Sequence, residues 1–130
     1  MTTAEVDAHP LQTDSVDLSV LKSFDNPDMG GDPELIVELI DLYQDEAAKL
    51  VETIRVALEK NDWTAVKRAA HSLRGSSSNL GILQMALIAG DLEHLEFTET
   101  ISAERLFQSL TEEIVRVIVI LNQERNRRTA

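Results

Sequence analysis

The chain has 130 residues, no cysteine and a formal net charge of −11 at pH 7. This length suits one domain with a sizeable hydrophobic core, and the lack of cysteine excludes disulfides and thiolate metal sites. An acidic chain is a poor candidate for binding nucleic acid, because such binding depends on neutralisation of phosphates by Lys and Arg.

The sequence predicts no targeting signal and no membrane segment. The first ten residues lack the basic and apolar regions of a signal peptide. The longest apolar run, Ile114 to Leu121, contains Arg116 and is too short to cross a bilayer. Because a cysteine-free chain also fits a reducing compartment, we expect a cytoplasmic protein.

The charge is unevenly placed along the chain. Residues 1–60 carry 14 acidic and 4 basic side chains, whereas residues 61–130 carry 9 acidic and 8 basic ones. Lys67, Arg68 and Arg74 gather around His71. We expect a local basic patch there, which would favour docking onto an acidic pocket of a partner.

The first elements are a tail and a short helix. Residues 1–15 are polar and without periodicity, so we expect a disordered tail. An apolar pattern over residues 16–24 predicts a brief helix that ends before Asn26-Pro27, since the residue before proline disfavours helix. Asp32-Pro33-Glu34 then starts a long helix, with Asp32 as N-cap and proline at the first position.

Three further helices follow. Asp62 is expected to cap the helix that starts at Trp63, and Gly81 lies just past its end. Another helix surrounds residues 85–95, and Ser102 is expected to cap a last helix that extends past Leu121. Apolar residues recur at intervals of three to four through these segments, as amphipathic helices require.

These elements predict an all-α fold, an antiparallel four-helix bundle with a short additional N-terminal helix. We expect the bundle to occupy residues 16–125, followed by a C-terminal tail at 126–130, and to be a monomer. The inward stripe of the helix after Asp62 contains Trp63, Val66, Ala70, Leu73, Ser77 and Leu80. His71 falls on the opposite side, so it is predicted to be exposed.

His71 begins the most informative motif of the chain. Arg74 follows at i+3 and Gly75 at i+4, so all three share one helix face. Imidazole titrates near pH ~6.5, so its neutral form is available as a nucleophile at physiological pH. A neighbouring cation can neutralise an oxyanion, and a bare glycine leaves room for a large partner. This combination suits a phosphoryl group that is received and handed on.

The motif resembles the signature of the histidine-containing phosphotransfer (HPt) domain, the intermediate carrier of phosphorelays. The matching positions are His71, Leu73, Arg74, Gly75, Ser76, Ser77, Leu80 and Gly81. The resemblance extends over about Val16 to Leu121. It implies a phosphorelay intermediate in two-component signal transduction, with His71 as the phosphoacceptor.

The resemblance also implies an acceptor that orients the imidazole, about 22 residues after the histidine, and Glu93 occupies this position. Arg74 and Lys67 can offset charge on the phosphoryl oxygens. Gly75 keeps the approach open, although packing of a neighbouring helix would also explain it. Ser78 is a candidate hydrogen-bond donor to the phosphoryl group.

No cofactor of the chain itself is expected, because the sequence has neither a glycine-rich nucleotide loop nor an obvious metal cage. By resemblance, Mg²⁺ belongs to the partner's receiver domain, whose aspartate is phosphorylated. The implied partners are response-regulator receiver domains and a hybrid or other sensor histidine kinase. We expect a phosphoryl carrier without autonomous kinase activity, not an enzyme.

Other interpretations remain for several features. A scaffold that binds a receiver or kinase without carrying phosphate is the alternative function. Asp91 and His94 have the i, i+3 spacing of two metal ligands, which we interpret as a surface coincidence. The apolar side chains of Val115, Val119 and Ile120 are expected to pack against the short N-terminal helix, with a dimer or partner contact as the alternative.

Overall fold

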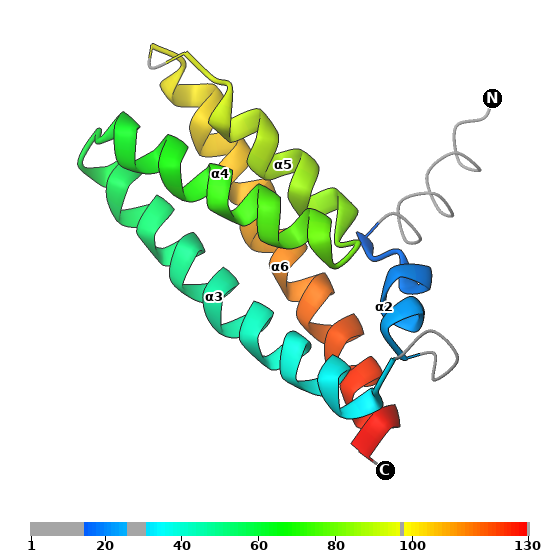
Figure 1. Ribbon diagram of the computed structural model, residues 1–130. Coiled ribbons are helices and arrows are strands. Elements are labelled where there is room, and N and C mark those ends of the chain that lie inside the picture. Colours follow the sequence, from blue (N-terminus) through cyan, green and yellow to red (C-terminus); the bar gives the residue numbers. More distant parts are fainter. Residues whose placement is uncertain (1–14, 26–30, 97, 130) are drawn as a thin grey trace, which may run out of the picture.

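The computed structural model describes residues 15–25, 31–96 and 98–129. Within these ranges the chain is helical and contains no strand. The helices are α2 (Leu18–Asp25), α3 (Pro33–Glu59), α4 (Trp63–Asn79), α5 (Leu83–Glu93) and α6 (Thr100–Thr129). Figure 1 shows their arrangement.

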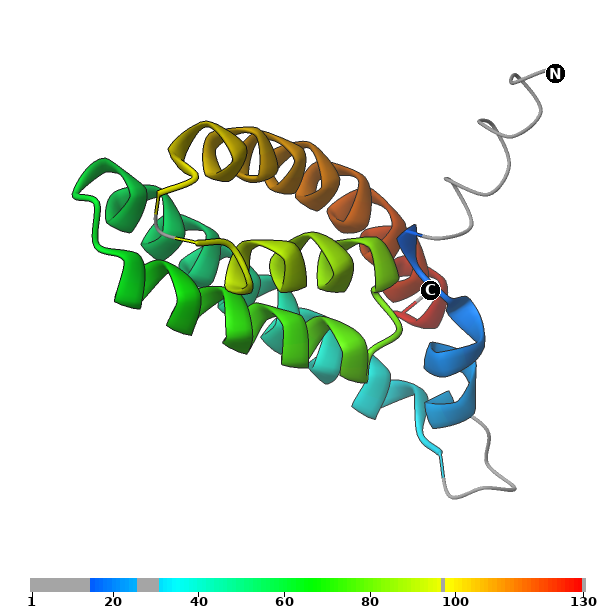
Figure 2. The same ribbon diagram turned by 90° about the horizontal axis from the view of Figure 1, so that it is seen from above.

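The four longer helices form an antiparallel bundle, as predicted from the sequence. Helix α3 packs against α4 and α6, and α5 packs against the same two helices. Helix α2 lies across the end of the bundle where α3 begins and the α4–α5 connection turns, as two views agree (Figures 1 and 2). The backbone N–H of Asp17 donates to the carbonyl of Gly81 at 2.7 Å, which ties this end together.

The predicted ends of α3 and α4 are confirmed. The Asp32 side chain accepts from the Glu34 N–H at 2.9 Å, and Pro33 is the first residue of α3. The Asp62 side chain accepts from the Ala65 N–H at 3.1 Å. Gly81 has a φ of +72°, the left-handed conformation that favours glycine just past a helix end.

Two ends of α6 differ from the prediction. The helix begins at Thr100, so Ser102 does not cap it; instead, the Glu99 carboxylate accepts from the Glu96 N–H at 2.9 Å in the preceding turn. The helix also continues through residues 126–129, which we expected to form a tail. Arg128 explains this extension, since it pairs with Glu124 one turn earlier at 3.0 Å.

The N-terminal boundary also differs by one residue. Ser15, which we assigned to the tail, is buried. The rest of that predicted tail, residues 1–14, lies outside the described residues.

The packing predicted for Val115, Val119 and Ile120 on α6 is wrong in part. Helix α2 packs mainly against α3, and Val115 and Val119 remain 62% and 53% exposed, while Ile120 is half-buried against the core. With Ser15 and Arg116 these side chains line a shallow groove of about 370 Å³.

No described helix is long and apolar enough to span a membrane.

The core contains one polar pair that links two helices. The hydroxyls of Tyr43 on α3 and Ser77 on α4 lie 2.8 Å apart, and both residues are buried. The remaining inward residues predicted for α4 are buried as well, except that Trp63 is half-buried. This packed side fixes the rotation of α4 and so decides which residues the helix presents to solvent.

Tyr43 provides a direct test of the core. Burial, helped by the negative charge of Glu113, raises the pKa of Tyr43 to about 12. Tyr43 is the single tyrosine of the chain, so phenolate absorbance reports this group alone. We expect a titration midpoint near pH 12, and stability that is lost as pH rises from ~10 toward that value, since the unfolded phenol ionises near pH ~10. A midpoint near the unfolded value would show that the hydroxyl is solvated.

Candidate functional site

His71 lies on the outward face of α4. Its neighbours Ala70 and Leu73 are fully buried on the opposite side, and this packing turns the imidazole outward. The His71 side chain is 64% exposed. The predicted exposure is therefore confirmed, and a docking protein can reach the ring.

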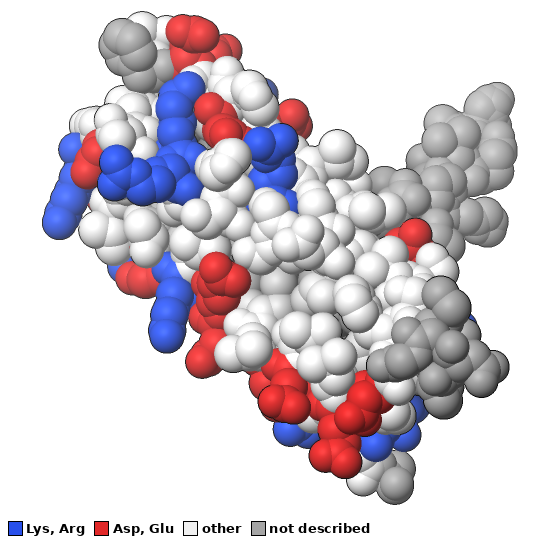
Figure 3. All heavy atoms as spheres, viewed as in Figure 1, with Lys and Arg blue, Asp and Glu red and all other residues white. Residues whose placement is uncertain are grey.

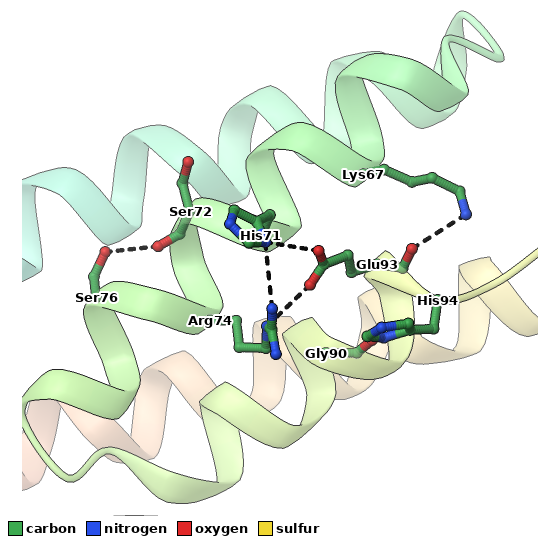
Figure 4. Close-up of polar contacts among 8 residues, drawn as sticks. All are labelled: Lys67, His71, Ser72, Arg74, Ser76, Gly90, Glu93 and His94. Atoms are coloured by element: carbon green, nitrogen blue, oxygen red, sulfur yellow. Dashed lines mark hydrogen bonds and ion pairs between the residues drawn. The ribbon is translucent and has the colours of Figure 1, made fainter.

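Glu93, the last residue of α5, reaches the ring from the side (Figure 4). Its Oε2 lies 2.7 Å from Nδ1 of His71. An ionised carboxylate only accepts hydrogen bonds, so Nδ1 must carry the proton. In the neutral form of the imidazole the other ring nitrogen, Nε2, then has the lone pair, and the hydrogen bond to Glu93 favours this one tautomer.

Arg74 contacts both members of this pair. Its Nε lies 2.9 Å from Oε1 of Glu93 in an ion pair, although their orientation does not make a hydrogen bond. Its Nη2 lies 3.3 Å from Nδ1 of His71. Because Nδ1 donates its proton to Glu93, this second contact is a close approach of two donors, and the carboxylate is the true partner of the guanidinium.

These contacts set the ionisation of Glu93. Partial burial acts to raise its pKa, but the hydrogen bond from His71 and the positive charge of Arg74 outweigh burial, so the pKa of Glu93 is lowered from its ordinary value of 4.5. A lowered pKa in the folded state contributes stability that is present above pH 4.5 and is lost as pH falls through the folded value. The carboxylate thus remains a hydrogen-bond acceptor throughout the physiological pH range.

A Glu93→Gln variant tests the orienting role that the resemblance implies for Glu93, and it is expected to accept a phosphoryl group on His71 more slowly. The amide oxygen can still accept from Nδ1, but it supplies no negative charge for the ring. We expect a loss in transfer rate of about tenfold for Glu93→Gln and up to ~100-fold for Glu93→Ala, by analogy with the range typical of groups that orient a metal-ligating histidine. The comparison is made by following label transfer at matched protein concentrations. Equal rates for all three proteins would show that Glu93 does not support the imidazole.

Lys67 has a different position from the one expected. Its Nζ donates to the backbone carbonyl of Glu93 at 3.1 Å, so it caps the C-terminal end of α5. Lys67 thereby holds the residue that holds His71. Its charge is directed at the helix end in this structure, not at the exposed edge of the imidazole.

His94 was not identified from the sequence as part of this site. Its Nδ1 lies 2.7 Å from the carbonyl of Gly90, to which it donates, so it also satisfies the end of α5 (Figure 4). Its position directly after Glu93, at a helix end, is the sequence signal for such a cap. Among the described residues, no group of three or more His, Cys, Asp or Glu side chains is arranged to hold a metal ion, so Asp91 and His94 belong to no such group.

Gly75 and Ser78 lie on the same outward face as His71. A Cβ built on Gly75 would have nothing within 4 Å, so no neighbouring helix requires this glycine, and the space in front of it is open. Ser78 is exposed but lies seven residues from His71, about 10 Å along the helix axis. The structure therefore does not bring Ser78 to the imidazole.

The surface around the site is basic. Lys67, Arg68 and Arg74 all project from the part of α4 that contains His71, and Figure 3 shows basic side chains gathered there, whereas acidic side chains gather toward the start of α3. The predicted basic patch is present on an otherwise acidic molecule. Such a distribution orients a partner whose docking surface is acidic.

Comparisons with known proteins agree on one family. Residues 38–119 match the model of the Hpt domain. The chain is 35% identical over 54 residues to histidine-containing phosphotransfer protein 5 of Arabidopsis thaliana, an overlap of 39% of this chain and 34% of that protein. The chain thus spans about a third of the length of this relative.

The fold agrees as well. The crystal structure of histidine-containing phosphotransfer protein B from Pseudomonas aeruginosa PAO1 is similar, with a TM-score of 0.76 and 25% sequence identity, over 92% of this chain and 98% of that one.

Proposed function

Since the chain belongs to the Hpt domain family, we propose that it is a phosphorelay intermediate in two-component signal transduction, which accepts a phosphoryl group on Nε2 of His71 and passes it on. One observation supports Nε2 as the atom that accepts the phosphoryl group. Glu93 occupies Nδ1 at 2.7 Å on an imidazole that is 64% exposed, so Nε2 has both a lone pair and access to a partner.

The transfer step needs no proton movement on the ring. The Nε2 lone pair attacks phosphorus, and the bond from phosphorus to the carboxylate oxygen of the partner's aspartate breaks. The aspartate leaves with the electron pair. The imidazole becomes positively charged, with its Nδ1 proton still donated to Glu93, and the negative carboxylate stabilises this charge. Transfer to the next aspartate is the reverse step.

Charge and space around His71 support such a step. Phosphoryl transfer depends mainly on positioning and on charge neutralisation. Arg74 can supply positive charge beside the ring, and Gly75 leaves the approach open. The chain offers no nucleotide loop, so the phosphoryl group comes from a phosphorylated partner, and Mg²⁺ is supplied by the receiver domain.

The partners follow from the same proposal. They are response-regulator receiver domains and a sensor histidine kinase, met one at a time by a monomeric carrier in the cytoplasm. The basic patch around His71 favours the acidic pocket that a phosphorylatable aspartate and its Mg²⁺ require. The chain acts as a carrier and has no kinase activity of its own.

Label transfer from a receiver tests the proposal. The protein is mixed with a receiver domain that carries a labelled aspartyl phosphate, with Mg²⁺ present, and the label on each protein is followed with time. We expect label to appear on this chain and to be acid-labile, as a phosphohistidine is. Stable binding to receivers without any transfer of label would instead support the scaffold function.

A further inference from the structure

Gly90 lies inside α5, about one turn before Glu93. A glycine inside a helix costs ~1 kcal/mol relative to alanine, so its presence calls for a local reason. A Cβ built on Gly90 would lie 3.2 Å from Cδ of Arg74, which is closer than ordinary contact. Apart from the two chain neighbours of Gly90 and the backbone of its own helix, no other atom comes within 4 Å of that position. The bare backbone of Gly90 therefore faces the stem of Arg74.

The Arg74 stem must pass this point to make its contacts. Arg74 projects from α4, and its guanidinium meets Glu93 on α5 at 2.9 Å and His71 at 3.3 Å. Figure 4 shows the side chain between the two helices, with Gly90 on the α5 side. Any side chain at position 90 would narrow the space through which Arg74 reaches Glu93.

We propose that Gly90 is a positioning residue, whose missing side chain seats Arg74 so that the guanidinium holds Glu93 in the orientation that keeps the proton on Nδ1 of His71. The inference rests on the proposed role of His71 as phosphoacceptor. It assigns Arg74 a task in the resting protein, before any phosphoryl group arrives. The two glycines then have different tasks. Gly75 leaves space for the partner protein, and Gly90 leaves space for the Arg74 side chain of the protein itself.

The test compares Gly90→Ala in two backgrounds. Phosphoramidate, a small phosphoryl donor, is used so that protein docking does not enter the rate. We expect Gly90→Ala to slow phosphorylation by up to about tenfold when Arg74 is present, because the new methyl group displaces the Arg74 stem; tenfold is the lower end of the effect of removing a partner that orients a metal-ligating histidine. In the Arg74→Ala background we expect no further loss from Gly90→Ala, because the stem that the new methyl group displaces is gone.

A spectroscopic signature separates positioning from a general structural effect. In the unphosphorylated protein, ¹⁵N chemical shifts of the His71 ring report which nitrogen carries the proton. We expect the Nδ1-protonated form in the wild type and a mixture of both tautomers in Gly90→Ala. Asp91→Ala is the matched control, since it adds an alanine to the same helix at the adjacent exposed position; its rate and tautomer should equal those of the wild type.

Three outcomes would each contradict a different claim: the role of Gly90, its action through Arg74, or the proposed function of His71. Wild-type rate and tautomer in Gly90→Ala would end the proposal. An equal loss in both backgrounds would show that Gly90 serves the packing of α4 against α5 and not Arg74. Undiminished labelling of a His71→Gln protein would mean that the proposed function is at fault, whatever Gly90 does.

Discussion

Replacement of His71 by glutamine is expected to reduce phosphoryl acceptance to background. Glutamine offers an amide in place of the imidazole, and an amide nitrogen has no free lone pair with which to attack phosphorus. Because the side chain is largely exposed but donates a hydrogen bond to Glu93, the free energy of unfolding should fall by about 1 kcal/mol at most. The measurement is label transfer from a phosphorylated receiver, with urea unfolding of the same protein as a check of folding.

His94→Gln is the matched control for this variant. His94 is also exposed and stands beside Glu93, but its Nδ1 serves a backbone carbonyl at the end of α5. We expect the His94 variant to retain acceptance within a small factor. Persistent labelling of His71→Gln, together with loss of label in His94→Gln, would show that His94 is the phosphoacceptor.

Gly81→Ala is expected to cause a large loss of stability at the turn between α4 and α5. The residue has a φ of +72°, and an L-residue in this region costs ~1–2 kcal/mol. The new Cβ would also lie 2.8 Å from Cγ2 of Val20 and 3.0 Å from the carbonyl oxygen of Asp17. Overpacking of this kind costs a further ~1–3 kcal/mol. We expect a total loss of about 2–5 kcal/mol, measured by urea unfolding.

Such a loss is a large share of the ~5–15 kcal/mol that stabilises a typical domain. Gly75→Ala is the control, because it makes the same chemical change in an exposed helical position with nothing within 4 Å. It should stabilise the free protein by up to ~1 kcal/mol. If the two variants unfold at the same urea concentration, the tight contact between α2 and the α4–α5 turn is absent in solution.

The sequence predicted the parts of the site that depend on periodicity. The apolar stripe of α4 determines its rotation, so the exposure of His71 followed from spacing alone. Two explanations of Gly75 remained open, and the structure excludes the packing of a neighbouring helix. The caps at Asp32 and Asp62 followed from local chemistry in the same way. Glu93 was expected on family resemblance, and the structure brings its carboxylate to the ring, because α4 and α5 are antiparallel neighbours.

The contacts of the long basic side chains could not be predicted. Lys and Arg have many rotamers of similar energy, and their partners depend on the neighbouring helix. Lys67 therefore caps α5 and Arg74 turns toward Glu93, whereas the sequence predicted that both cations offset charge on the phosphoryl oxygens. The packing predicted for Val115, Val119 and Ile120 against α2 was wrong in part for a different reason. The direction in which so short a helix packs is set by tertiary contacts, which sequence spacing does not reveal.

The most direct test of the role proposed for His71 is to identify the phosphorylated atom. The protein, labelled with ¹⁵N in its histidine rings, is phosphorylated with phosphoramidate, and coupling between phosphorus and the ring nitrogens is measured by NMR. We predict a phosphorus–nitrogen bond at Nε2 of His71, with the proton retained on Nδ1 beside Glu93. A phosphoryl group on Nδ1 of His71, or on any other residue, would contradict the role proposed for Nε2 of His71.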